Sequence, residues 1–216
     1  MNIPFSQDQF FSVFEVYNLS LWPIQILFNV LGVVCIIILV RNGPKCSEIL
    51  FSVLSFFWVW MGVVYHIHYF SSINRIAYLF GSVFIIQGLV FLYFGAINRK
   101  IKFNFNLDLP GIIGMVLIAY ALVVYPIISH FVGHIYPRSP TFGVPCPTTI
   151  FTFGILLHSD RRVPWFIILI PLLWSFIGFS AALNLSVKED FGLLVAGMLA
   201  SPILLFYYKP ISQVKK

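Results

Sequence analysis

Long apolar stretches alternate with short polar ones along almost the whole chain. The apolar stretches fall at roughly 20–40, 48–70, 76–97, 110–132, 146–159, 164–184 and 190–208. A helix that crosses a bilayer needs about 20 predominantly apolar residues. Six stretches reach this length, whereas 146–159 is too short to cross about 30 Å of hydrocarbon at about 1.5 Å per residue. The pattern predicts an all-α, polytopic membrane helix bundle of about seven transmembrane helices, the fifth of them short and broken.

Composition supports a membrane protein rather than a soluble one. Of the 216 residues, 60% are hydrophobic and 9% are charged, and the mean hydropathy is +0.95. Soluble domains carry about 25% charged residues, so a soluble domain and a disordered chain are excluded. The net charge of +6 does not indicate a nucleic-acid partner, because Lys and Arg occur in short clusters between the apolar stretches. We expect one transmembrane domain at 20–208, an outer interfacial segment at 1–19 and a cytoplasmic tail at 209–216.

The positions of Lys and Arg predict the orientation. If all seven stretches cross, ten of the thirteen basic residues lie on one side, and only Arg75, Arg138 and Lys188 lie on the other. If the fifth stretch re-enters instead of crossing, this bias disappears. Because basic loops stay in the cytoplasm, we expect seven crossings, with the N-terminus outside and the C-terminus cytoplasmic.

The segment before the first apolar stretch has the pattern of a short amphipathic helix. Ser6 followed by Gln9 is typical of a capping box at a helix start. Aromatic residues recur after it at helical spacing: Phe10, Phe11, Phe14 and Tyr17. We expect this helix to lie at the outer surface of the membrane that the chain spans, within the interface between water and lipid.

A cluster of prolines interrupts the chain before the fifth stretch. Pro137, Pro140, Pro145 and Pro147 cannot sit together inside a helix. We therefore expect residues 139–147 to form a loop that dips inward, and a helix that begins at Pro147 with Cys146 as its N-cap. Thr148 and Thr149 then fall in the first turn. Broken helices of this kind form transporter sites, because free N–H groups face the cavity.

Cys146 has two interpretations at this helix start. A helix N-terminus favours the thiolate, which gives a reactive or metal-binding sulfur, whereas apolar burial opposes it. The alternative is a small packed residue that shapes a bend between two prolines.

Four of the five histidines fall at the outer ends of predicted helices, two on the second and two on the fourth. His130 and His134 are four residues apart, a spacing that allows two imidazoles to bind one metal. His66 and His68 point to opposite faces of their helix, so at most one joins them. With Cys146 they form a candidate site for Zn or Cu, and haem is a less favoured cofactor. The alternatives are an interfacial belt of amphipathic side chains and a proton-responsive cluster.

Three amides lie within the apolar stretches. Gln25 and Asn29 share a face of the first helix, and Gln87 lies near the middle of the third. Such groups face the interior of a bundle, where they either bond to other helices or line a polar path. The chain contains no nucleotide-binding or hydrolase motif, so an enzyme is less favoured than a binding protein.

Three stretches of the chain resemble a family of uncharacterised bacterial multi-pass membrane proteins. They are NIPFSQDQFFSVFEVYN, LWPIQ and FGVPCPTTIFTFGILL. The resemblance extends over the whole chain and implies an all-helical protein of the bacterial inner (plasma) membrane. It implies no activity.

These observations predict an integral membrane protein with an outer-facing polar cavity that binds or passes a small solute, with a soft metal ion among the candidates. Cys146, Thr148 and Thr149 would form the floor of the cavity. A non-catalytic membrane scaffold or accessory subunit, and a haem or redox membrane protein, are the alternatives. The expected partners are the lipid bilayer and the solute, and no particular oligomeric state is predicted.

Overall fold

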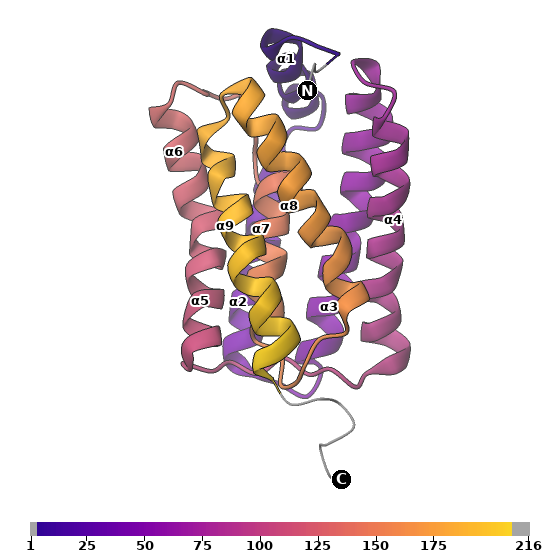
Figure 1. The fold of residues 1–216 in the computed structure, drawn as a ribbon, viewed down its shortest axis with the longest axis vertical. Coiled ribbons are helices and arrows are strands. Elements are labelled where there is room, and N and C mark those ends of the chain that lie inside the picture. The colour runs from indigo at the N-terminus through magenta and orange to yellow at the C-terminus, as the bar shows by residue number, and fades with distance from the viewer. Residues whose placement is uncertain (1–3, 209–216) are drawn as a thin grey trace.

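The computed structural model describes residues 4–208, which form a bundle of helices (Figure 1). Helices α2 (Ile24–Arg41) to α9 (Phe191–Pro202) run along the long axis, and α1 (Gln7–Ser20) lies across the upper end in this view. Residues 4–208 contain no β-strand. The predicted all-α class is therefore confirmed. The predicted tail at 209–216 lies outside the described residues.

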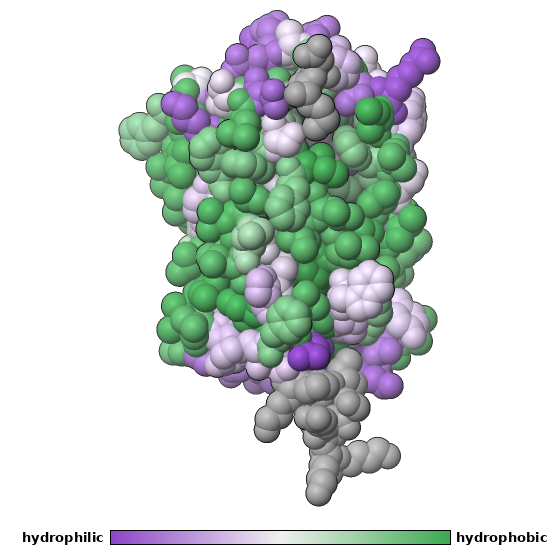
Figure 2. Space-filling model, in the orientation of Figure 1, coloured by the Kyte–Doolittle hydropathy of each residue, from purple (hydrophilic) through white to green (hydrophobic). Residues whose placement is uncertain are grey.

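Within residues 4–208, six helical stretches are long and apolar enough to cross a membrane. Figure 2 shows the corresponding apolar band between two more polar ends. The six are α2; α3 (Cys46–Trp60) with η1 (Met61–Tyr69) and η2 (Phe70–Ser72); α4 (Ala77–Tyr93) with η3 (Phe94–Asn98); α5 (Leu109–Ala119) with η4 (Tyr120–Val124) and α6 (Tyr125–Phe131); α8 (Trp165–Leu185); and η5 (Lys188–Asp190) with α9 and η6 (Ile203–Tyr207). Several of these stretches change helical type along their length, because η1, η3, η4 and η6 are π-helical and η2 and η5 are 3₁₀ turns.

The short fifth helix, α7 (Pro145–Leu156), lies inside the bundle, where it packs against α3, α5, α8 and α9. Every residue of α7 except Cys146 is buried. The helix begins at Pro145 with Val144 as its N-cap, so the predicted start at Pro147 and the predicted N-cap role of Cys146 are wrong. Two prolines fit in this first turn because the first N–H groups of a helix have no partner within the helix.

The loop before α7 enters the bundle, and Asn18 of α1 provides partners for its backbone. Asn18 Nδ2 donates to the carbonyl oxygens of Pro137 at 2.7 Å and Ser139 at 2.9 Å. Its Oδ1 accepts from Thr141 Oγ1 at 3.0 Å, and the side chain is fully buried. Irregular backbone inside a membrane protein needs such internal partners. The loop therefore depends on α1 for its conformation.

Helix α1 has the predicted capping box, in which Gln9 N donates to Ser6 Oγ and Ser6 N donates to Gln9 Oε1. The helix is thus confirmed, and it packs on the bundle through Phe11, Phe14 and Tyr17, all buried. Trp60 Nε1 donates to the Tyr17 hydroxyl at 2.9 Å. Burial raises the pKa of this phenol, so it stays neutral.

Two glycines let α5 and α7 approach closely. A Cβ atom on Gly114 would lie 2.7 Å from the carbonyl oxygen of Gly154, and a Cβ on Gly154 would lie 2.8 Å from the carbonyl oxygen of Gly114. Small residues at such positions are how membrane helices pack backbone against backbone. The contact fixes the depth of α7 in the bundle.

Gln87 compensates for a proline in the neighbouring helix α8. Pro171 has no N–H, so the carbonyl of Ile167, four residues earlier, loses its partner within the helix. Gln87 Nε2 donates to this Ile167 oxygen at 3.0 Å, in a fully buried position. The amide therefore joins α4 to α8 at the point where Pro171 interrupts the hydrogen bonding of α8.

Candidate functional site

A cavity of about 230 Å³ lies beneath α1, between η1, α4 and α8, and reaches the first turn of α7. Its walls are mainly apolar, and aromatic side chains from five different segments of the chain contribute to them: Phe10, Phe14, Tyr65, Phe70, Phe80 and Trp174. Several of these rings pack edge to face, as do Phe80 and Trp174 with centroids 5.4 Å apart. The walls therefore suit an apolar body of modest size.

Several polar groups also line the cavity. His66 is fully buried, and neither of its ring nitrogens has a hydrogen-bond partner among residues 4–208. Trp174 Nε1 is likewise buried and unpaired within the same part of the chain. Cys146, the half-buried member of α7, borders the same space. Unpaired buried polar groups are costly, so His66 and Trp174 are candidates to bond a ligand or water in this cavity.

Gly178 of α8 lies beside both the sulfur of Cys146 and the indole of Trp174. A Cβ atom at this position would lie 3.5 Å from Cys146 Sγ and 3.7 Å from Trp174 Nε1. The sulfur and the indole nitrogen therefore lie beside the same glycine.

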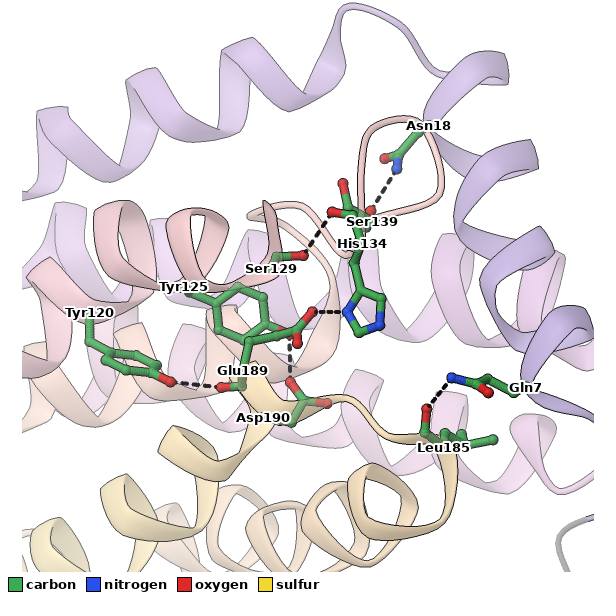
Figure 3. Close-up of polar contacts among 10 residues, drawn as sticks. All are labelled: Gln7, Asn18, Tyr120, Tyr125, Ser129, His134, Ser139, Leu185, Glu189 and Asp190. Carbon is green, nitrogen blue, oxygen red and sulfur yellow. Dashed lines mark hydrogen bonds and ion pairs between the residues drawn. The ribbon is translucent and has the colours of Figure 1, made fainter. Parts of the chain in front are cut away.

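Two adjacent acidic residues, Glu189 and Asp190, lie at the start of the last helical stretch and are both buried (Figure 3). Tyr125 Oη donates to Asp190 Oδ1 at 2.5 Å, and Tyr120 Oη donates to the backbone oxygen of Glu189 at 2.8 Å. His134 Nδ1 lies 2.8 Å from Glu189 Oε1. Asp190 lines the cavity, whereas Glu189 faces His134. Ionisable groups buried inside a membrane helix bundle are candidates for functional sites.

Sequence reasoning missed this acidic pair, although one signal was present. The chain has only seven Asp and Glu residues, and two of them stand side by side immediately before an apolar stretch. Tyr125 and Trp174 were also missed as site residues. Their roles arise from contacts between helices that are far apart in the sequence.

The structure separates the five predicted metal ligands. His66 and Cys146 line the cavity beneath α1, while His134 faces Glu189. His68 and His130 are exposed. Among residues 4–208, no three His, Cys, Asp or Glu side chains are placed to hold one metal ion. Of the five predicted ligands, His66 and Cys146 therefore line the cavity beneath α1, and the five do not form a joint metal site.

The predicted cavity amides and threonines mostly bond to other parts of the protein. Gln25 Nε2 donates to the backbone oxygen of Asn18, and Asn29 Nδ2 donates to that of Gln25. Thr148 Oγ1 accepts from Gly143 N at 3.0 Å, while Thr149 Oγ1 is buried and unpaired among the described residues. Asn29 also lines a second cavity of about 260 Å³, on the α6 side of Tyr125, together with His130 and His134.

Comparison with known protein families finds a match for this chain. Residues 7–213 match the family of unknown function DUF6064, which is almost the full length. The chain belongs to the DUF6064 family. This membership confirms the resemblance to uncharacterised proteins inferred from the sequence. No curated protein and no solved structure matches this DUF6064 protein. Because the family has no assigned function, the function of this DUF6064 protein has to be inferred from its cavity.

Proposed function

We propose that this protein is a small-solute-binding protein of the bacterial inner membrane, with a binding cavity beneath α1 that opens on the outer side. The observation that carries the proposal is the position of Cys146. It is the one residue of α7 that is not buried, and it lines a cavity that is also lined by His66 and Trp174, whose buried polar atoms are unpaired among the described residues. An apolar cavity with a few convergent polar groups is the usual form of a small-molecule site.

The distribution of charge supports the orientation. The end of the bundle opposite α1 carries basic residues from three separate connections, among them Arg41, Arg99 and Arg161. Basic loops stay on the cytoplasmic side, so α1 and the cavity beneath it face outward. With α7 counted as a short crossing inside the bundle, the chain crosses seven times and the N-terminus lies outside.

The packing below the cavity favours binding over an open pore. From Pro147 to Leu156, every residue of α7 is buried. Trp58 Nε1 donates to Thr152 Oγ1 at 3.0 Å, and Thr152 Oγ1 donates to the carbonyl of Thr148 at 2.8 Å, so polar groups here are used within the protein. A solute that enters from the α1 side therefore meets a closed floor.

Cysteine modification from one side of the membrane tests the proposal. Cys35 and Cys46 are buried, and in a variant with both replaced by Ala the remaining thiol is Cys146. We expect the small, membrane-impermeant reagent 2-(trimethylammonium)ethyl methanethiosulfonate to modify Cys146 in right-side-out vesicles at least tenfold faster than in inverted ones. Lys45→Cys in protein that also lacks Cys146 is the control at an exposed position, and it should show the reverse preference. Absence of modification from either side, or modification from the inner side alone, would overturn the proposal.

A further inference from the structure

We propose that the cavity beneath α1 selects organic cations, meaning small molecules with a quaternary ammonium or protonated amine on an apolar body. The inference rests on the proposed function and names the class of solute. Its basis is the juxtaposition of one buried carboxylate, Asp190, with a wall of aromatic rings.

The carboxylate supplies the charge that a cation needs. Asp190 is 4% exposed and lines the cavity, and its Oδ1 accepts from Tyr125 Oη. In Figure 3 the other carboxylate oxygen points away from Tyr125. No Lys or Arg is found among the described residues that line this cavity. A buried carboxylate is stable as an ion when a positive charge or several hydrogen bonds accompany it, and among the described wall residues His66 alone could carry such a charge.

The neighbouring acid does not share this role. Glu189 is directed to His134, with Nδ1 and Oε1 2.8 Å apart, and it does not line the cavity. The two adjacent acids therefore face different surroundings. Glu189 has a partner within the protein, whereas Asp190 is the acidic group that a bound solute meets.

The aromatic walls add a second source of cation recognition. Trp174, Phe80 and Tyr65 all line the cavity. The indole ring of a Trp such as Trp174 makes the strongest cation–π interaction of the aromatic side chains. A cationic group binds a ring face within about 6 Å of the ring centroid. An engineered cavity of about 150 Å³ holds benzene, so about 230 Å³ leaves room for a trimethylammonium group with a short chain.

Protection of Cys146 measures binding at this place. Methyl methanethiosulfonate, a small neutral reagent, reports access to Cys146 in purified protein that lacks Cys35 and Cys46. The probes are choline and its uncharged isostere 3,3-dimethyl-1-butanol, which have the same shape. We expect choline to halve the rate of modification at a concentration at least tenfold below that of the alcohol.

Substitutions separate charge from shape. Asp190→Asn should abolish the preference for choline and leave protection by the alcohol within twofold of the wild type. Glu15→Gln, which removes an acid from the outer face of α1, is the control and should keep the preference. Trp174→Leu should weaken protection by choline about fivefold and by the alcohol less than twofold. If Asp190→Asn does not fold, the probe preference of the wild type and the effect of Trp174→Leu decide the question.

The outcomes distinguish this inference from the proposed function. A reactive Cys146 that choline protects no better than the alcohol, or not at all, overturns the cation preference and leaves an accessible cavity. A preference that persists in Asp190→Asn also overturns it. If Cys146 does not react even with the small reagent and no probe present, the cavity is closed and the proposed function fails first.

Discussion

His134 Nδ1 lies 2.8 Å from Glu189 Oε1, and this contact joins the loop after α6 to the start of the last helical stretch. The Glu189 side chain is fully buried and that of His134 is 12% exposed. When one partner of such a buried pair is removed, the other is left without compensation. The contact therefore fixes the position of Asp190, the next residue, beside the cavity.

His134→Ala should lower the free energy of unfolding by about 3 kcal/mol, because it leaves the Glu189 carboxylate buried and unpaired. Thermal unfolding in detergent measures the loss. Arg99→Ala breaks the exposed pair with Glu48, where the side chains are 59% and 37% exposed, and it should cost less than about 1 kcal/mol. Equal losses for the two variants would show that burial does not strengthen the His134–Glu189 contact.

Gln87 and Pro171 should be energetically coupled. Gln87→Leu leaves the Ile167 carbonyl without the donor that lies 3.0 Å away, at an expected cost of about 1–3 kcal/mol. In a Pro171→Ala background the new N–H of residue 171 takes over that carbonyl, so the same change should cost less than half as much. A double-mutant cycle of unfolding free energies measures the coupling. An identical cost in both backgrounds would refute the role assigned to Gln87.

Gly154→Ala should destabilise the bundle by about 1–3 kcal/mol, because the added methyl meets the backbone of α5. The new Cβ would lie 2.8 Å from the Gly114 oxygen and 3.1 Å from the Ile118 nitrogen. Thermal unfolding and the yield of monodisperse protein report the effect. Gly43→Ala is the matched control, since no atom lies within 4 Å of a Cβ there. A Gly154→Ala protein as stable as Gly43→Ala would mean that α5 and α7 are not in backbone contact.

The hydrophobic pattern predicts the architecture well. Six stretches of about 20 apolar residues correspond to the six long helices, and the shortness of 146–159 corresponds to α7. These features are local, because they depend on stretch length and on proline positions. The start of α7 was misplaced by two residues because either Pro145 or Pro147 can open a helix.

The site was predictable only in part, because it depends on contacts between distant segments. Tyr125 and Asp190 are 65 positions apart, and neither has a local pattern that marks the other as its partner. Cys146 was found because two prolines flank it. Gln87 was found as a buried amide, but its partner is a carbonyl freed by Pro171 in another helix. Pairings of this kind follow from helix packing, which a single sequence does not specify.

The most direct test of the central claim, that Cys146 is reached through the cavity beneath α1, is to fill that cavity. Ala181 lines it, and Ala119 is exposed on the outside of α5. In protein without Cys35 and Cys46, Ala181→Trp should slow the modification of Cys146 by methyl methanethiosulfonate at least tenfold, whereas Ala119→Trp should leave the rate unchanged. Equal rates in the two variants, both folded, would contradict the account.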